Sequence, residues 1–353
     1  MAGMAQTQEP VAVAVVGVGR MGRHHARTYA VLPGARLLAV VDADAERAGD
    51  AAEEYGCAAC ATTEELLERF PRVQAVTVAT PTKFHVAAAA PLLRAKVACL
   101  VEKPIAGSVA EARELVELAG RTGTPLQVGH TERFNPAVRA VAALNIPARF
   151  VEVDRVSPMT FRSLDVGVVL DLMIHDLDIV LMLARSGVKS VEAVGVAVMG
   201  EHEDVASARV HFENGCVANL TASRLALKTE RKLRLFSEAA YVSLDYQRRS
   251  GVVIHRTAND AALGDVRAQI AGGADLSSLD YSKLVRVDEL SMGQEESDPL
   301  RAELTSFLEC VRTGRRPEVD AEAGLAAVDA AERVRAAIRA HRWEGLDTSA
   351  WRV

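Results

Sequence analysis

The sequence lacks the features that mark membrane, secreted and nucleic-acid-binding proteins. No stretch reaches the ~18 uninterrupted apolar residues of a membrane span, and residues 1–10 lack the basic start and apolar core of a secretory signal. A basic excess is also missing, since 41 Lys and Arg stand against 47 Asp and Glu, and a nucleic-acid-binding surface needs one. We therefore expect a cytoplasmic protein that binds neither membrane nor nucleic acid.

The cysteines are few and irregularly placed. Five are present, an odd number, which argues against a disulfide framework and fits a reducing compartment. Cys57 and Cys60 form a C-x-x-C pattern, but the second ligand pair that a zinc site needs is missing from the sequence around them. We expect two small thiols there, and no metal site in the protein.

The 353 residues suffice for two domains of about 150 residues each. Residues 10–130 alternate helical patterns with short runs of Val, Leu and Ala that lack polar alternation, as strands buried on both faces do. These runs are Val11–Val16, Arg36–Asp42, Ala75–Thr80, Ala98–Glu102 and Pro125–Gly129. The series predicts an α/β domain with a doubly wound parallel sheet over residues 10–130.

A different pattern follows the fifth strand. A strand is predicted over Arg149–Val156 and a long apolar helix over Asp165–Arg185. About six short β-like segments then run to His255, with Asn214-Gly215 as a hairpin turn. Strands in succession predict an α+β domain over residues 131–320, built on an open, mostly antiparallel sheet. The long helix would cover one face of this sheet and leave the other free for a second subunit.

The C-terminal part is predicted to contain a loop and two helices. Residues 258–281 are rich in Gly, Ala, Asp and Ser, and we expect them to form a loop. Pro299–Thr313 and residues 321–341 are amphipathic, and we expect both helices to pack back against the first domain.

A glycine-rich turn follows the first strand. In Gly17-Val18-Gly19-Arg20-Met21-Gly22, Gly17 permits the tight turn, Gly19 lets the backbone approach a pyrophosphate, and Gly22 lets the helix pack closely on the strand. The helix amino end then offers free N–H groups to phosphates. Asp42 ends the second strand, where the ribose-binding carboxylate belongs. The pattern predicts a dinucleotide site that prefers NAD to NADP.

Two further motifs carry reactive side chains. Glu102-Lys103-Pro104 follows a later strand of the same sheet, at the edge where open α/β sheets bind their ligands. Asp171 and His175 lie four residues apart on the long helix and so share one face. An imidazole is a natural general base near neutral pH.

Together these residues resemble the Gfo/Idh/MocA family of oxidoreductases over nearly the whole chain. The resemblance is carried by the glycine turn, Asp42, Thr80-Pro81-Thr82-Lys83-Phe84-His85, Glu102-Lys103-Pro104 and Asp171-Leu172-Met173-Ile174-His175-Asp176. It implies a Rossmann domain for NAD, with Thr80, Pro81, His85 and Glu102 at the cofactor. It places Lys103 beside the nicotinamide, before a proline that often follows a cis peptide bond, and gives Asp171 and His175 to the substrate.

The resemblance implies a division of roles among the reactive side chains. His175 would remove the hydroxyl proton, and Lys103 would hydrogen-bond the reacting oxygen and stabilise its developing charge. Asp171 would orient the substrate, or tune Lys103 and His175. The ordinary alternatives are a solvated surface lysine and a core or capping histidine. His24 and His25 are expected only as residues of a helix start.

The substrate class rests on a second stretch of the resemblance. Glu132-Arg133-Phe134-Asn135-Pro136 is similar to the family branch that acts on UDP-sugars. It implies oxidation of the 3-hydroxyl of UDP-N-acetylglucosamine to a ketone, ahead of amino-sugar synthesis for lipid A or surface polysaccharide. Arg133, Asn135 and Arg162 are candidate substrate contacts. One departure concerns Gly167, because the family often carries several glycines before the catalytic helix.

Two alternatives remain open. Another sugar or inositol dehydrogenase of the same family would use the same lysine and histidine. A non-catalytic NAD(H)-binding regulator would bind the cofactor without turnover. In each case we expect homodimers or homotetramers formed through the C-terminal sheet, because exposed sheets are usually covered.

Overall fold

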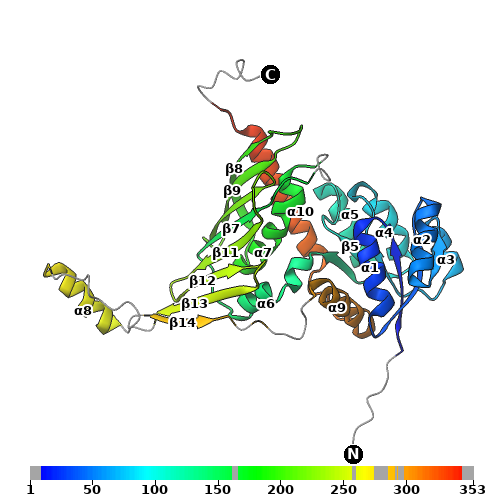
Figure 1. Ribbon diagram of the computed structural model, residues 1–353, viewed down its shortest axis with the longest axis horizontal. Coiled ribbons are helices and arrows are strands. Elements are labelled where there is room, and N and C mark those ends of the chain that lie inside the picture. The colour runs from blue at the N-terminus through cyan, green and yellow to red at the C-terminus, as the bar shows by residue number, and fades with distance from the viewer. Residues whose placement is uncertain are drawn as a thin grey trace, which may run out of the picture. The chain divides into compact units, whose positions relative to one another are not determined.

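The computed structural model describes residues 9–160, 166–256, 260–273, 285–290, 292 and 298–343. The chain divides into two compact units (Figure 1). The first comprises residues 1–139 and 293–329, and the second comprises residues 140–292 and 330–353. Each unit is described by itself below.

The first unit is built on a six-stranded parallel sheet of order β3-β2-β1-β4-β5-β6. Every residue of the three central strands is buried, which explains their unbroken apolar character. This arrangement confirms the doubly wound sheet. The strands are β1 (Val11–Val16), β2 (Ala35–Val41), β3 (Ala58–Cys60), β4 (Ala75–Val78), β5 (Ala98–Glu102) and β6 (Leu126–Gly129).

Helices cover the sheet of the first unit. They are α1 (Arg20–Val31), α2 (Ala45–Tyr55), α3 (Thr63–Arg69), α4 (His85–Arg94), α5 (Val109–Thr122) and α9 (Pro299–Thr313), with short 3-10 turns at η1 (Thr82–Phe84) and η2 (Thr131–Phe134). Residues of α9 complete the core that α1 and β1 begin, since Leu304, Phe307 and Leu308 pack with Val13 and Tyr29. A segment distant in sequence thus closes this core.

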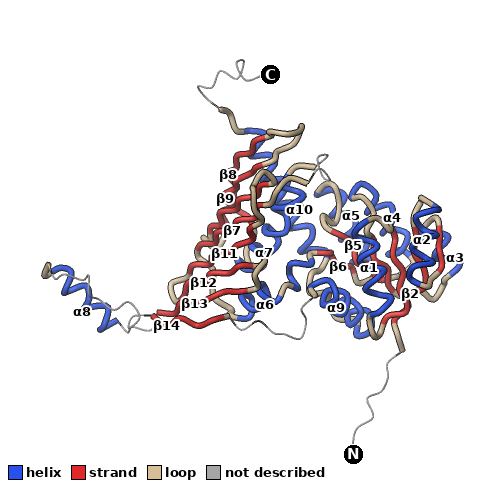
Figure 2. Tube along the Cα trace, viewed as in Figure 1, coloured by secondary structure: helices blue, strands red, loops and turns tan. Residues whose placement is uncertain are grey.

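The second unit is built on an eight-stranded sheet of order β14-β13-β12-β11-β7-β10-β9-β8 (Figure 2). All its neighbouring strands are antiparallel except β7 and β10, which run parallel. The sheet confirms the predicted open, mostly antiparallel architecture. The strands are β7 (Phe150–Val156), β8 (Val188–Val196), β9 (Val205–Phe212), β10 (Val217–Ser223), β11 (Glu230–Phe236), β12 (Ala240–Asp245), β13 (Ser250–Arg256) and β14 (Val285–Glu289).

One face of the second sheet is covered by a helix. Helix α7 (Ile174–Ala184) packs on β7 and β10, whose side chains are alternately buried and half-buried. The turn between β9 and β10 places Gly215 at φ +86°, so the predicted Asn214-Gly215 hairpin turn is confirmed.

The loop expected over residues 258–281 is wrong in its first half. Helix α8 (Asp260–Ala271) occupies this stretch, whereas residues 274–281 lie outside the described part of the chain. Alanine has the highest helix propensity, and the composition that suggested a loop contains four alanines within these twelve residues. The described side chains of the helix are exposed or half-exposed, so apolar periodicity could not indicate it.

Two helices contribute residues to both units: α6 (Pro136–Ala143) and α10 (Ala321–Ala340). In the first unit, Gly324 of α10 lies so close to Val128 that an added Cβ would contact its side chain at 2.5 Å. In the second unit, Arg333 donates to the Val188 carbonyl oxygen at 3.0 Å. The sequence led us to expect the whole helix on the first domain.

Across the described residues, no helix combines the length and apolarity needed to cross a bilayer.

Candidate active site

The glycine turn of the first unit shapes a cradle. Gly17 has φ +85°, and a Cβ there would lie 2.7 Å from the Thr80 backbone nitrogen, so a side chain is excluded. A Cβ on Gly22 would overlap the Gly17 carbonyl oxygen, which keeps α1 tight against β1. A Cβ on Gly19 would meet nothing of the described chain within 4 Å. The space beside Gly19 is therefore open to a ligand.

The amino end of α1 suits an anion. Gly19 is its N-cap and offers no side-chain cap, and the first turn carries no acidic residue. The free backbone N–H groups and the helix dipole thus face the open space beside Gly19, as in pyrophosphate sites. Arg20 is exposed and Met21 is half-buried. These residues fit a dinucleotide pyrophosphate.

Asp42 lies directly beside the glycine turn. Its Oδ2 accepts from the Val18 N–H at 2.9 Å, and its Oδ1 accepts from the Asp44 N–H at 3.0 Å. Arg47 approaches the same carboxylate at 3.4 Å and pairs with Asp44 at 3.0 Å. A half-buried carboxylate at this point can accept ribose hydroxyls and repel a 2′-phosphate.

Replacing Asp42 should therefore change cofactor choice. We expect Asp42→Ala to weaken NAD by about tenfold or more, since a charge-assisted hydrogen bond contributes about 1.5–3 kcal/mol, and to reduce the discrimination against NADP. Asp44→Asn removes a neighbouring carboxylate while retaining an N-cap residue, so it should leave the preference in place. Binding of both cofactors would be measured by calorimetry. An unchanged NAD/NADP ratio in Asp42→Ala would refute the ribose assignment.

Lys103 follows a buried ion pair at the end of β5. His25 on α1 lies with Nε2 2.7 Å from Glu102 Oε1, and Glu102 Oε2 accepts from the Lys103 backbone N–H at 3.2 Å. Burial works to raise the pKa of Glu102, but the hydrogen bond and charge of His25, with the charge of Lys103, hold it below its ordinary value. Lys103 is half-buried, and the Lys103–Pro104 peptide bond is cis. His25, expected only as a helix-start residue, thus contacts the carboxylate that accepts from the Lys103 backbone.

Glu303 on α9 is a second buried carboxyl group of the first unit. Its Oε2 accepts from Thr131 Oγ1 at 3.0 Å, and among the described residues Oε1 has no hydrogen-bond partner. Burial, with the negative charge of Glu102, raises its pKa well above 4.5. An ionised carboxylate without a cation is costly in such a place, so the site favours the protonated form of Glu303.

The raised pKa of Glu303 predicts how stability depends on pH. The folded state keeps a proton that the unfolded chain loses above pH 4.5, so this group's contribution is fully present below pH 4.5 and is lost as pH rises toward the folded pKa. The loss amounts to about 1.4 kcal/mol per pH unit. Glu303→Gln stays neutral throughout, and we expect its advantage over wild type to grow above pH 4.5. Urea unfolding between pH 4 and 8 measures this, with exposed Glu309→Gln as control; a constant difference would contradict it.

His85 joins the Thr80-Pro81 segment to the Glu-Lys-Pro motif. Its Nδ1 lies 2.9 Å from the Pro104 carbonyl oxygen, and its Nε2 lies 2.9 Å from that of Thr80. Burial lowers the pKa of His85 despite these backbone contacts, so the neutral ring donates to one carbonyl at a time. The ring is buried, whereas Pro81 is exposed. A direct contact of His85 with the cofactor stays a prediction.

In the second unit, the Asp171–His175 segment adopts an unexpected helical form. A π-helical turn, η3 (Val169–Met173), precedes α7, and the Ile174 N–H bonds to the Val169 carbonyl five residues earlier. Such wide turns are frequent at functional sites. Asp171 and His175 are half-buried, and the His175 Nδ1 atom is shielded from solvent. The predicted continuous α-helix thus contains a π-helical turn, with hydrogen bonds one residue longer than in an α-helix, where Asp171 lies.

The remaining predicted substrate residues differ in their placement. Asn135 is buried and caps α6, because its Oδ1 accepts from the Ala137 N–H at 3.0 Å and its amide donates to Glu132 at 3.2 Å. Arg133 is half-buried on η2. Arg162 lies outside the described residues. Within the described ranges, no three metal-ligating side chains gather into one site.

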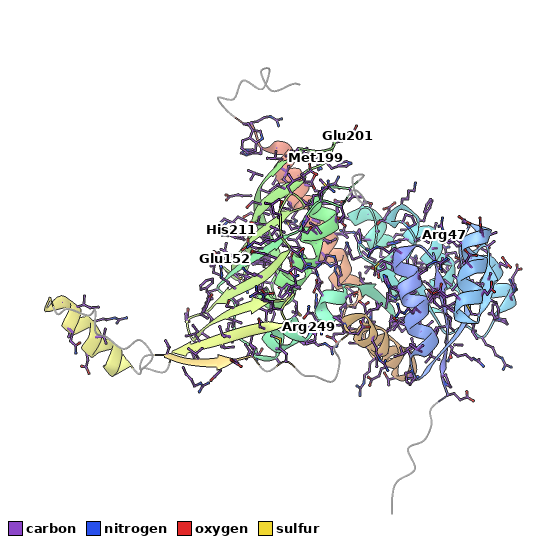
Figure 3. The ribbon with its side chains drawn as sticks, viewed as in Figure 1. Arg47, Glu152, Met199, Glu201, His211 and Arg249 are labelled. Atoms are coloured by element: carbon purple, nitrogen blue, oxygen red, sulfur yellow. The ribbon has the colours of Figure 1, made fainter. Side chains whose placement is uncertain are left out.

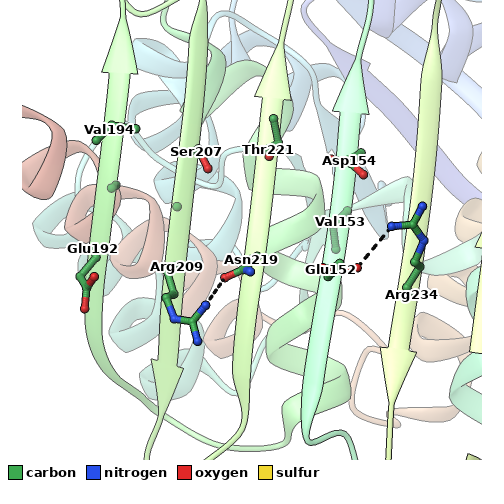
Figure 4. A pocket seen from close by; sticks show the side chains of 12 residues that line it. Glu152, Val153, Asp154, Glu192, Val194, Ser207, Arg209, Asn219, Thr221 and Arg234 are labelled. Carbon is green, nitrogen blue, oxygen red and sulfur yellow. Dashed lines mark hydrogen bonds and ion pairs between the residues drawn. The ribbon is translucent and has the colours of Figure 1, made fainter. Parts of the chain in front are cut away.

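A hollow of about 430 Å³ lies on the outer face of the second sheet, across β7 to β11 (Figure 4). Ion pairs and hydrogen bonds cross it, from Arg234 to Glu152 at 3.3 Å and from Arg209 to Asn219 at 3.1 Å. Glu152 and His211 project from this face, away from α7 (Figure 3). The residues that line the hollow are mostly charged or polar, with Val153, Ala193, Val194 and Ala208 among them, and include none of the predicted site residues.

The nucleotide-binding edge of the first unit, with the open sheet and the Asp171–His175 helix of the second, defines an NAD-dependent oxidoreductase. Residues 11–130 match the model of the oxidoreductase family with an NAD-binding Rossmann fold. Residues 109–243 match the GFO/IDH/MocA C-terminal domain. The chain belongs to the Gfo/Idh/MocA family of dehydrogenases.

Individual relatives agree with this assignment. The chain is 36% identical to the UDP-N-acetylglucosamine 3-dehydrogenase of Acidithiobacillus ferrooxidans over 327 residues, 92% of this chain and 96% of that protein. A solved structure of UDP-N-acetylglucosamine 3-dehydrogenase GnnA from that organism superposes with a TM-score of 0.82 at 34% identity, covering 93% and 97% of the two chains.

More distant relatives share part of the chain or the fold. The inositol 2-dehydrogenase of Rubrobacter xylanophilus is 36% identical over 183 residues, 50% of this chain and 52% of that protein. GenD2 from gentamicin A biosynthesis in complex with NAD has the same fold, with a TM-score of 0.77 at 22% identity, covering 96% and 97% of the two chains.

Proposed function

We propose that the protein oxidises the 3-hydroxyl of UDP-N-acetylglucosamine to a ketone with NAD, in amino-sugar synthesis for lipid A or surface polysaccharide. The observation that carries this proposal is the 36% identity to a UDP-N-acetylglucosamine 3-dehydrogenase along 92% of the chain. The inositol 2-dehydrogenase resemblance is equally strong per residue but spans half the chain, so an inositol or other sugar substrate is the alternative.

The chemistry divides between two proposed catalytic side chains. His175 accepts the proton of the hydroxyl that is oxidised, since a half-buried imidazole can act as a base near neutral pH. Lys103 donates a hydrogen bond to the same oxygen and stabilises the negative charge that develops there. NAD, when bound, supplies the hydride acceptor. The Glu102 carboxylate, held by His25, favours the protonated form of Lys103.

Other side chains would bind and orient the substrate. Asp171 is proposed to accept a sugar hydroxyl. Arg133 and Arg162 are proposed contacts for the diphosphate, because guanidinium groups suit bidentate phosphate binding. Asn135 supports this region by capping α6, and its substrate contact remains part of the proposal.

The proposed assembly is a cytoplasmic homodimer or homotetramer. The outer face of the second sheet would form the subunit interface, because it carries charges of both signs and an uncovered sheet face commonly meets another subunit.

The test is a substrate panel with NAD. UDP-N-acetylglucosamine, N-acetylglucosamine, glucose and myo-inositol would be followed by NADH absorbance. A parallel mass-spectrometric run with an added α-keto acid would detect turnover in which the cofactor stays bound. A ketone product from the nucleotide sugar alone is the expected result. Turnover only of myo-inositol or a free sugar would establish the alternative, and no turnover in either format would contradict both.

A further inference from the structure

A buried ion pair lies beside the proposed base in the second unit. The Arg155 guanidinium on β7 donates two hydrogen bonds to the carboxylate of Asp176, the residue after His175. They run from Nε at 2.6 Å and from Nη2 at 2.9 Å. The two side chains are 4% and 2% exposed. A fork of this kind fixes direction as well as distance. It also isolates both charges from solvent screening.

We propose that Arg155 and Asp176 are positioning residues for His175, which fix the direction of its imidazole and cancel a negative charge beside it. The proposal rests on the proposed role of His175 as base. Successive residues of an α-helix point about 100° apart. Because Asp176 is held against β7, the neighbouring His175 side chain projects from the helix in a fixed direction.

Because β7 and β10 run parallel, Arg155 and Arg224 lie at the same end of the two strands. Arg155 lies opposite Ala222 in the register, and Arg224 follows at the same end of β10. Arg224 donates to Asp204 at 2.6 Å and to the Val166 carbonyl at 2.9 Å. Its pair with Asp204 is as deeply buried as that of Arg155, at 5% and 0% exposure, but its carboxylate lies before β9 and not on the helix.

The elements around His175 carry both apolar and charged side chains. The inward side chains of β7 and β10 are apolar before the arginines, namely Val151, Val153, Ala218, Leu220 and Ala222. In the described part of the chain, charged or titratable groups on the helix or at these strand ends include Asp171, Asp178, Glu203, Asp204, Arg224, Arg231, which lies opposite Arg155 on β11, and Tyr246, whose ring lies 6.0 Å from Arg155 Cζ. Asp176 is adjacent to His175 in the sequence, and Arg155 holds its carboxylate.

Two variants separate charge from direction. Asp176→Asn leaves the Arg155 charge uncompensated, which disfavours the imidazolium. We expect the titration of His175 to move about 0.5 to 1 pH unit lower, on the scale of a nearby like charge. Arg155→Lys keeps the charge but loses the fork. We expect kcat to fall about tenfold with the sugar KM within about threefold, because small misplacements of a catalytic group are costly, and the titration to stay in place.

Arg224→Lys is the matched control, because it alters an equally buried Arg–Asp ion pair that follows the neighbouring strand. It should lose thermal stability comparable to that of Arg155→Lys without moving the His175 titration. The titration is followed by NMR of the imidazole Cε1 proton in the protein alone, with the signal assigned by its loss in His175→Gln. This readout needs no substrate.

The outcomes are distinct. An unmoved His175 titration in Asp176→Asn overturns the charge role, and a kcat in Arg155→Lys no lower than in Arg224→Lys overturns the orienting role. Full activity of His175→Gln would instead defeat the proposed function, whatever the titration shows. If Asp176→Asn does not fold, Asp176→Glu, which keeps the charge and displaces the carboxylate, should lower kcat and leave the titration in place.

Discussion

Replacing Lys103 with alanine is expected to abolish turnover while NAD still binds. The side chain is proposed to stabilise charge on the reacting oxygen, and the loss of one such donor costs about 10²–10³-fold in kcat. Cofactor affinity is proposed to depend mainly on the glycine turn, the amino end of α1 and Asp42, and this substitution leaves their contacts with one another intact. NADH formation and NAD calorimetry on the same preparation measure the two effects separately.

Two companion variants define the result. Lys189→Ala removes an exposed lysine of β8 and should leave both measurements unchanged. Lys103→Arg keeps the charge but replaces a compact ammonium by a planar fork, so it should recover little of the rate. Normal turnover in Lys103→Ala would remove this lysine from the mechanism.

Replacing His175 with alanine is expected to reduce kcat by about 10²–10⁴-fold, the usual contribution of a general base. The acid limb of the pH–rate profile should disappear with it, so that the residual rate rises with hydroxide concentration. Added imidazole should restore part of the rate, because a small base can occupy the vacated space. His211→Ala, on the outer face of the second sheet (Figure 3), should keep both the rate and the profile. An unchanged profile in His175→Ala would show that another group takes the proton.

The two catalytic variants are expected to differ in whether an added small molecule restores the rate. Loss of Lys103 removes a hydrogen-bond donor and its positive charge, and we expect added imidazole to restore neither. Loss of His175 removes a base whose task an external molecule can perform. Rescue by imidazole in one variant and its absence in the other would therefore separate charge stabilisation from proton transfer.

The sequence predicted those elements whose signals are local. The buried strands of the first unit have unbroken apolar runs, and the glycine turn and Asn214-Gly215 require backbone conformations that few residues allow. The fold class and the family were therefore predicted correctly. The helix α8 was missed because its described residues lack a buried face that could create periodicity.

The residues that support Lys103 in the first unit and His175 in the second were not predicted, because their partners are distant in the chain. His25 meets Glu102 across 77 residues, and Arg155 meets Asp176 across 21. One signal was available for Glu303, an acidic residue inside the apolar stripe of α9 beside Ala302 and Leu304. A charged residue in a core-facing position indicates either a partner or a shifted protonation state.

Helix α9 has a consequence for how the protein is made. The first unit needs Leu304, Phe307 and Leu308 to complete its core, yet residues 140–292 of the second unit precede them. At ribosomal rates of about 5–20 residues per second, the nascent first unit waits roughly 8–30 seconds for these side chains. During that interval the apolar surface that α9 later covers is exposed to chaperones and to neighbouring chains. A fragment ending at residue 139 would carry that surface permanently, and should aggregate unless α9 is supplied as a peptide.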